Sequence, residues 1–217
     1  MKTDPLTARW VGRMRFADAL ALQEKLVAEK RADHSLGDQL LLLEHDPIYT
    51  IGRTPDHSSL RGADLPHPVF PINRGGQATY HGPGQLIGYP IIDLRTRGQD
   101  LHRYLRWLEE LLVEALATFD IAATTRDGLT GVWVENRKIA SIGVGVRHWI
   151  TMHGFALNVA GDLSPFDQIV PCGISNVTMT SIEKETGRAD SVMEVASRVG
   201  EVAGRRLSEL RGAEMVA

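Results

Sequence analysis

The sequence predicts an α/β protein of the α+β type, in which a mixed, largely antiparallel sheet is flanked by helices. Three long segments carry apolar residues at helical spacing, and several short apolar segments bounded by turn residues lie between them. These strands and helices do not alternate one for one along the chain, which disfavours a doubly wound parallel sheet. The 217 residues contain no internal repeat or low-complexity linker, so we expect a single domain over residues 1–217.

The helical segments differ in how clearly they are marked. The first has one polar residue, Gln23, within its apolar face, and the second has the widest apolar face of the chain. The third begins with Ser191 and Glu194, which have the spacing of a capping box. Three helices are therefore expected, over residues 16–32, 100–119 and 191–210.

The short apolar segments are separated by residues that favour turns. Asp46–Pro47 separates the first two, and Asn136–Arg137 and the region near His148 divide the last three into a meander. The expected strands comprise residues 39–45, 48–52, 68–73, 86–94, 131–135, 138–146 and 153–159.

Composition excludes several classes of protein. The 24 basic and 27 acidic residues are mixed along the chain, whereas a dedicated nucleic-acid-binding protein usually has a basic excess. One cysteine excludes an internal disulfide and indicates a reducing compartment. We find no apolar segment of signal-peptide or membrane-spanning length, so we expect a cytoplasmic protein that binds neither nucleic acid nor membrane.

Residues 74–86, "RGGQATYHGPGQL", are rich in glycine and proline and follow a predicted strand. Glycines at such a place allow positive φ and let backbone N–H groups approach a ligand closely. The segment lacks the lysine of a phosphate-binding loop and the spacing of a dinucleotide-binding fingerprint. An ordered surface loop and a ligand-binding loop are equally good interpretations of this spacing alone.

The only cysteine, Cys172, lies between a proline and a glycine. A free cysteine is most often a small buried apolar residue, and the alternative is a nucleophile. A nucleophilic cysteine needs a nearby cation or base, for which His81, His153 and the few lysines are candidates. Lys138 follows the Asn136–Arg137 turn, where an exposed, solvated lysine would be ordinary.

Four segments together resemble the bacterial-type octanoyltransferases, in order and in approximate spacing. They are "RGGQATYHGPGQLIGYPI", "RKIASIGVGV", "HGFALNV" and "IVPCGIS", and the resemblance extends from about residue 40 to residue 185. It implies the fold shared by biotin and lipoate protein ligases, which is related to class II synthetase cores. It also implies transfer of an octanoyl group from acyl carrier protein to one lysine of a lipoyl domain, the first step of protein lipoylation.

The resemblance also implies the roles of particular residues. Cys172 would carry the acyl group as a thioester, and Lys138 would be the active-site lysine. The substrate-binding positions would be Arg74, Gly75, Gly76, Gln77, Ala78, Thr79, Tyr80, His81, Ser141, Ile142, Gly143, Gly154, Phe155 and Ala156. A carrier thioester is already activated, so no ATP, metal or other cofactor is expected.

The implied partners are octanoyl-acyl carrier protein as donor and, as acceptors, the lipoyl domains of 2-oxoacid dehydrogenase E2 subunits and the glycine cleavage H protein. We expect a monomer. Small side chains at Ala140, Gly143 and Gly145 suggest room for a medium-length acyl chain. Because carrier proteins and lipoyl domains are generally acidic, a basic docking patch is expected; its candidate residues are Arg74, Arg95, Arg97 and Arg147.

Three other functions are compatible with the same residues. An ATP-dependent lipoate or biotin ligase would share the fold but would not need Cys172. A cysteine hydrolase would pair Cys172 with His81 or His153. A binding module for carrier proteins would use Cys172 only as part of its core.

Overall fold

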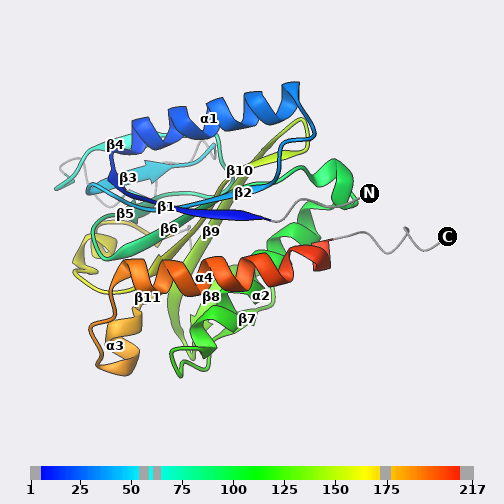
Figure 1. Cartoon of the computed structure of the whole chain (residues 1–217). Coiled ribbons are helices and arrows are strands. Elements are labelled where there is room, and N and C mark those ends of the chain that lie inside the picture. The colour runs from blue at the N-terminus through cyan, green and yellow to red at the C-terminus, as the bar shows by residue number, and fades with distance from the viewer. Residues whose placement is uncertain (1–5, 54–58, 61–64, 172–176, 211–217) are drawn as a thin grey trace.

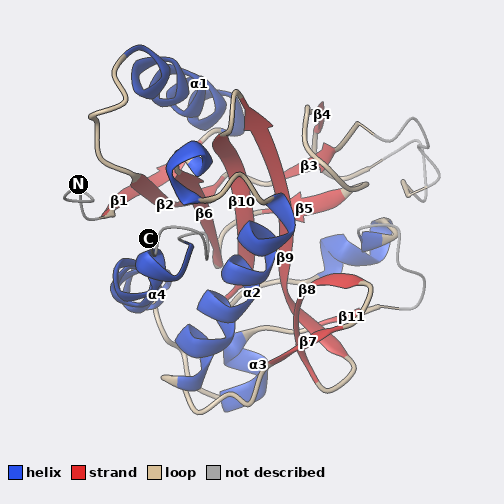
Figure 2. Cartoon of the chain, turned by 90° about the vertical axis from the view of Figure 1, so that its right-hand side faces the viewer, coloured by secondary structure: helices blue, strands red, loops and turns tan. Residues whose placement is uncertain are grey.

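Helices cover both faces of a central sheet in the computed structural model, which describes residues 6–53, 59–60, 65–171 and 177–210. Helix α1 lies on one face, and α2 and α4 lie on the other (Figures 1 and 2). The helices are α1 (Phe16–Ala32), α2 (Leu101–Ala117), α3 (Ile182–Thr186) and α4 (Val192–Arg206), with 3-10 turns η1 (Leu94–Arg97), η2 (Ser164–Gln168) and η4 (Leu207–Leu210). Within the described residues, none of these helices is long and apolar enough to cross a membrane.

The described strands form two sheets. The larger has the order β1-β2-β6-β10-β9-β8-β7, with β11 pairing β9, and the smaller has the order β4-β3-β5. The strands are β1 (Thr7–Met14), β2 (Gln39–His45), β3 (Ile48–Ile51), β4 (Val69–Pro71), β5 (Thr79–His81), β6 (Gln85–Ile91), β7 (Thr124–Arg126), β8 (Leu129–Val134), β9 (Arg137–Arg147), β10 (Ile150–Asn158) and β11 (Thr178–Met179).

The pairing of these strands confirms a mixed, largely antiparallel architecture. Only β1–β2, β3–β4 and β9–β11 pair in parallel among the described strands. The sequence prediction missed β1, β5, β7, β11 and α3. Strand β1 lies at a sheet edge and is largely exposed, and the other four are too short for periodicity to identify them.

The core lies on both sides of the larger sheet. Leu40 and Leu42 of β2 pack into the cluster under α2 and α4, whereas Leu41 and Leu43 pack into the cluster under α1. Successive side chains of a strand point to opposite faces, so the four consecutive leucines are those of a strand buried on both faces. Edge strand β1 packs against α4, where Gly200 leaves room for Ala8: a Cβ on Gly200 would lie 3.0 Å from the Ala8 Cβ.

Gln23, the polar exception on α1, is fully buried. Its Oε1 accepts a hydrogen bond from the backbone N–H of His153 in β10 (2.7 Å). Gln23, which breaks the apolar pattern of the helix, therefore links α1 to β10 and gives a buried backbone N–H its hydrogen-bond acceptor.

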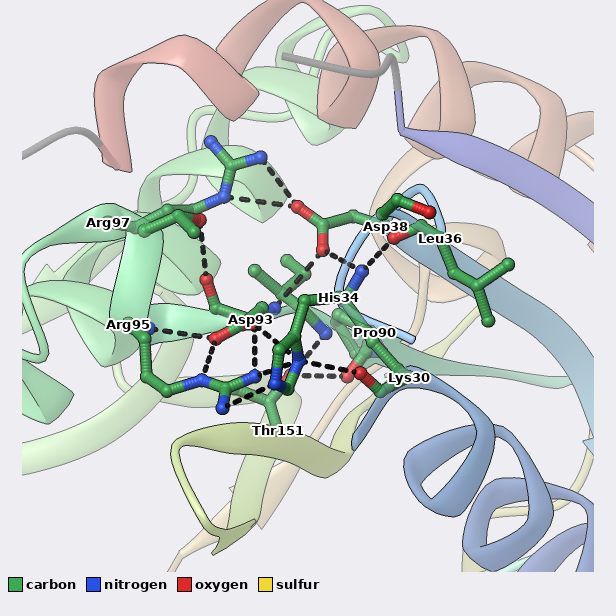
Figure 3. A network of polar contacts seen from close by, with 12 residues as sticks. Lys30, His34, Leu36, Asp38, Pro90, Asp93, Arg95, Arg97 and Thr151 are labelled. Carbon is green, nitrogen blue, oxygen red and sulfur yellow. Dashed lines mark hydrogen bonds and ion pairs between the residues drawn. The ribbon is translucent and has the colours of Figure 1, made fainter. Parts of the chain in front are cut away.

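A buried ionic network ties the end of α1 to β2 and η1 (Figure 3). Asp38 bridges Lys30 (Oδ1–Nζ 2.9 Å) and Arg97 (Oδ2–Nη2 2.5 Å), and all three residues are buried. Beside it, Arg95 forms an ion pair with Asp93. The ion pair with Asp38 holds Arg97 inside the fold, so Arg97 is not the docking residue that the sequence suggested. Arg95 is already paired with Asp93.

Two local structures predicted from the sequence, a capping box and a turn near His148, are confirmed. Ser191 and Glu194 form a complete capping box at the start of α4. His148 and Trp149 have φ of 53° and 63° between the paired residues Arg147 and Ile150, which makes a two-residue turn of the kind that matches strand twist. This turn ends the β9–β10 hairpin that carries half of the site described next.

Candidate active site

The three segments predicted to bind substrate meet at one pocket between α1, β5, β6, β9 and β10. The pocket has about 400 Å³ of atom-free space, including its open mouth. It is lined by Phe16, Ile72, Arg74, Thr79, His81, Tyr89, Ser141, Ile142, Gly143, His153, Gly154, Phe155 and Ala156. Segments that lie far apart in the sequence thus form its walls.

The middle of the glycine-rich segment does not line this pocket. Arg74 is buried, and its guanidinium donates to the backbone oxygens of Gly75 and Gln77 (2.8 and 3.0 Å) and to Thr50 on β3. The loop of Gly75, Gly76, Gln77 and Ala78 is therefore wrapped around the Arg74 side chain. Arg74 contributes to the pocket from inside the fold and is too buried for the predicted role in a docking patch.

Tyr80 also lies away from the pocket, although its neighbours Thr79 and His81 line it. Alternation along β5 turns Tyr80 into the aromatic cluster with Tyr49 and Phe166. Tyr80 therefore acts through packing rather than as part of the wall.

The small residues expected to line an acyl tunnel have three different environments. Gly143 lines the pocket beside Arg74, where a Cβ would lie 3.0 Å from the Arg74 Cδ. Gly145 lies in a neighbouring groove that also contains Arg53 and Arg147. Ala140 packs into the core under α2 and α4, so the expectation that it lines the pocket is wrong.

Four pocket residues were not among the predicted binding positions: Phe16, Ile72, Tyr89 and His153. Phe16 belongs to the apolar face of α1 and Tyr89 to an apolar strand, so sequence patterns indicate core for both. Only the crossing of these elements beside the glycine-rich segment makes them part of a site.

Two buried histidines, His81 and His153, line the pocket, and a third, His45, packs against Phe16 and Tyr89 of its wall. Burial lowers the pKa of each. The pKa of His81 falls to about 3, and those of His45 and His153 fall to about 4. Nδ1 of His45 lies 3.0 Å from the Met14 carbonyl, and its Nε2 lies 2.7 Å from the Tyr89 hydroxyl. A carbonyl can only accept, so His45 donates through Nδ1, and the Tyr89 hydroxyl donates to Nε2.

We expect the free energy of unfolding to fall as the pH drops below about 6.5. Above that pH these histidines are neutral in both states and contribute no pH dependence. Between pH 6.5 and about 4 the unfolded chain binds protons that the folded chain excludes. Each histidine then lowers stability by at most about 1.4 kcal/mol per pH unit. Urea unfolding at pH 7.5 and 5.5 measures this slope.

His45→Phe should flatten that slope, whereas His102→Phe, at an exposed position on α2, is the control and should leave it unchanged. Equal stability of the wild-type protein at both pH values would contradict the assignment of neutral buried histidines.

Lys138 is fully buried, so its interpretation as a solvated strand residue is wrong. In the β8–β9 pairing, Val132 is opposite Ala140 and Trp133 is opposite Lys138, so residue 139 is an extra, bulged residue. The bulge shifts the alternation of β9 and places Lys138 on the same side of the sheet as Ser141, which lines the pocket. Its Nζ lies 5.2 Å from the ring centroid of Trp133, within cation–π range.

A single peptide group links Lys138 to a buried carboxylate. Lys138 Nζ donates to the carbonyl of Thr130 (3.0 Å), and the N–H of the same peptide, that of Gly131, donates to Oε1 of Glu109 on α2 (2.9 Å). Glu109 is buried. Gly131 has φ of 129°, and a Cβ there would lie 2.6 Å from the Lys138 Cε. The peptide is thus polarised from both ends, and a side chain at position 131 would displace the lysine.

Cys172 lies outside the described residues. The structure describes its neighbours on either side: Val170 donates to the Ser59 carbonyl (2.7 Å), and β11 places Met179 opposite Lys138. In the described parts of the chain, no group of three or more histidine, cysteine, aspartate or glutamate residues could hold a metal ion.

Comparisons with known proteins identify the family. The lipoyl protein ligase A/B catalytic domain matches residues 15–203. An octanoyltransferase of Geobacter sulfurreducens is 53% identical over 189 residues, which are 86% of this chain and 78% of the relative. An octanoyltransferase of Geotalea uraniireducens is 54% identical over 190 residues, which are 88% of this chain and 87% of the relative.

Solved structures at lower identity share the fold. A bipartite lipoate protein ligase from Thermoplasma acidophilum is 16% identical, with a TM-score of 0.73 over 94% of this chain and 84% of that one. Biotin protein ligase from Aquifex aeolicus is 14% identical, with a TM-score of 0.59 over 94% of this chain and 72% of that one. The predicted lipoate and biotin ligase fold is therefore confirmed. With relatives at about half identity over most of its length, the chain belongs to the octanoyltransferase family, the acyltransferases of the lipoyl protein ligase A/B group.

Proposed function

We propose that this acyltransferase moves an octanoyl group from octanoyl-acyl carrier protein to one lysine of a lipoyl domain, through a thioester on Cys172. The observation that carries this proposal is the convergence of three separate segments on one pocket, with buried Lys138 three residues before Ser141 of its wall. We further propose that residues 1–217 act as one catalytic domain, as a cytoplasmic monomer, without a cofactor.

The first step transfers the acyl group to the enzyme. The Cys172 thiolate attacks the carbonyl carbon of the donor thioester, a new C–S bond forms, and the bond to the carrier sulfur breaks. The departing thiolate takes up a proton. A lysine ammonium close to Cys172 favours the thiolate by Coulomb attraction, and this is the role proposed for Lys138.

The second step transfers the acyl group to the acceptor. The neutral amine of the acceptor lysine attacks the enzyme thioester, a C–N bond forms, and the C–S bond to Cys172 breaks. The proton lost by the amine passes to the sulfur, with Lys138 as the group that can carry it. An amide replaces a thioester, so this step is downhill and needs no ATP.

Selection of an octanoyl chain would depend on burial in the pocket. Ile142 and Phe155 supply apolar wall from β9 and β10, and Phe16 supplies it from α1. Burial of six methylenes at ~0.8 kcal/mol each amounts to about 5 kcal/mol, which is enough to dominate chain selection.

Intact-mass spectrometry after incubation with octanoyl-acyl carrier protein, without ATP, tests the function. We expect one octanoyl adduct on Cys172, which disappears when a lipoyl domain is added and reappears as octanoylated lipoyl domain. Octanoylation of the lipoyl domain by an enzyme that never carries the adduct would contradict the thioester. Dependence on ATP would instead support a ligase.

The low pKa values of His81 and His153 disfavour a Cys-His hydrolase, because a general base works best with a pKa near the working pH. Release of free octanoate without an acceptor would support that alternative.

Of the arginines considered for docking, Arg147 remains exposed, and it lies with Arg53 in the groove next to the pocket. We expect Arg147→Ala to weaken binding of the acidic carrier roughly two- to five-fold at low salt and to reduce the salt dependence of KM. Arg198→Ala, at an exposed site on α4, is the matched control. A KM that is independent of salt in the wild-type enzyme would contradict electrostatic docking.

Glu109→Gln tests the link from α2 to Lys138. The amide keeps the shape but loses the charge that stabilises the Thr130–Gly131 peptide facing the lysine. We expect kcat to fall roughly ten- to a hundredfold, because a buried hydrogen bond to a charged group contributes roughly 1.5–3 kcal/mol. Glu110→Gln, on the exposed side of the same helix, is the control and should retain full activity. Equal kcat values for the two variants would show that Glu109 only provides a hydrogen-bond acceptor for the Gly131 N–H and does not affect catalysis through Lys138.

A further inference from the structure

A chain of buried side-chain amides runs from the pocket wall toward the strand that carries Lys138. Nδ1 of His81 lies 2.8 Å from Oε1 of Gln85. Nε2 of Gln85 lies 2.9 Å from Oδ1 of Asn158, and Nδ2 of Asn158 lies 2.9 Å from the Thr180 carbonyl. The chain thereby joins β5, β6 and β10 to the residue that follows β11.

Two backbone carbonyls fix the orientation of both amides. The Thr180 carbonyl can only accept, so Asn158 must present its NH₂ group there and its oxygen to Gln85. The Tyr80 carbonyl accepts a second hydrogen bond from Gln85 Nε2 (3.2 Å), which fixes Gln85 independently. Gln85 therefore presents its oxygen to His81, and His81 must donate through Nδ1.

The proton on Nδ1 leaves Nε2 of the neutral imidazole as an acceptor. The described partner of Nε2 is the Thr50 hydroxyl at 3.4 Å, which is long for an O–H···N hydrogen bond. Two positions earlier on β5, and on the same side of it, the Thr79 hydroxyl is buried, with no hydrogen-bond partner among the described residues. Thr79 and His81 both line the pocket. This wall therefore has two polar groups, His81 Nε2 and the Thr79 hydroxyl, whose hydrogen-bonding capacity is not filled by the described residues.

We propose that Gln85 and Asn158 are positioning residues that hold His81 as its Nδ1–H tautomer, so that Nε2 accepts a hydrogen bond from an N–H group of the substrate. This rests on the proposed octanoyl transfer. Two participants in that reaction carry N–H groups near the reacting carbonyl: the acceptor amine, and the amides of the pantetheine arm that carries the donor thioester.

His81 is suited to orient such a group rather than to carry its proton. With a pKa of about 3, about one molecule in ten thousand would hold the second proton at pH 7. A neutral acceptor in a fixed position still selects the direction from which an N–H group approaches, and this is what productive attack geometry requires.

Nitrogen-15 NMR of the imidazole rings tests the tautomer without any activity. In the wild-type protein we expect His81 to be protonated at Nδ1 and not at Nε2. Gln85→Leu removes the acceptor and should shift His81 toward the Nε2–H tautomer. Gln85→Glu keeps an acceptor for Nδ1 and should retain the original tautomer. His45, which donates to the Met14 carbonyl, is the internal control and should keep its own tautomer in both variants.

Kinetics then identify the source of the N–H group. We expect Gln85→Leu to lower kcat about tenfold in one half-reaction, which is the size of a lost hydrogen bond. A slower loading step with S-octanoyl-pantetheine, but not with the amide-free ethyl thio-octanoate, would identify the pantetheine arm. A slower transfer from preloaded enzyme to a lipoyl domain would identify the acceptor amine.

The proposal is overturned if wild-type His81 is protonated at Nε2, if Gln85→Leu keeps the wild-type tautomer, or if neither half-reaction slows. The wild-type spectrum and Gln85→Glu decide the matter even if Gln85→Leu does not fold. An enzyme with the expected tautomer but no octanoyl transfer would reject the proposed function and leave the tautomer assignment intact.

Discussion

Cys172→Ala is expected to abolish octanoyl transfer while leaving the fold intact. If the acyl group travels on this sulfur, no other group in the chain can replace it, because Cys172 is the only cysteine. Removal of a nucleophile that works together with its partners costs at least about a thousandfold in kcat. Octanoylation of a lipoyl domain, followed by mass spectrometry, measures the loss, and urea unfolding verifies the fold.

The single cysteine also supplies a chemical control. A thiol-alkylating reagent can modify only one cysteine per chain, so inactivation should follow the fraction of alkylated protein. Residual transfer by Cys172→Ala above about a hundredth of the wild-type rate would favour direct attack of the acceptor on the donor thioester.

Lys138→Met is expected to lower kcat by about 10²–10⁴, the usual contribution of a positioned acid–base group. The substitution keeps the length of the side chain and removes the ammonium. Lys138 is fully buried, so replacement of its charge by an apolar side chain should not lower the free energy of unfolding by much. The loss of activity can therefore be separated from a loss of folding.

Alkylation of Cys172 examines the same residue without substrate. If the Lys138 ammonium stabilises the thiolate, Lys138→Met should slow alkylation at neutral pH and move its pH profile upward. Lys138→Arg should recover only part of the activity, because arginine does not readily release a proton and Gly131 leaves little room for a larger group. The double variant with Cys172→Ala should be little worse than Cys172→Ala alone.

Wild-type alkylation and transfer in Lys138→Met would mean that the lysine is only a buried structural residue. Its hydrogen bond to Thr130 would then stabilise β8 and would have no part in the chemistry.

The sequence predicted the fold class from local patterns, because apolar periodicity marked the three long helices. The segments that form the pocket, with Ser141 and Gly154 among them, were predicted from the resemblance to octanoyltransferases and not from periodicity. The same patterns missed the burial of Lys138. Its position after a turn favours exposure, and only the bulge in β9 and the pairing with β11 bury it.

Arginines show the same limit. Arg74 and Arg97 are charged and lie in segments with strong turn signals, so the sequence indicates surface for both. The structure buries Arg97 with Asp38 and wraps a loop around Arg74. Such partners are distant in sequence or are backbone carbonyls, and neither appears in a pattern of residue types.

The contact between Ala8 of β1 and Gly200 of α4 has a consequence for the folding of the protein during its synthesis. Strand β1 is synthesised well before α4, the helix that covers it. Until residue 206 leaves the ribosome exit tunnel, the face of β1 and β2 that α4 covers has no helix over it. Domains generally fold as units during synthesis. We therefore expect this face of the sheet to stay exposed until α4 has been synthesised, and to be open to chaperones until then.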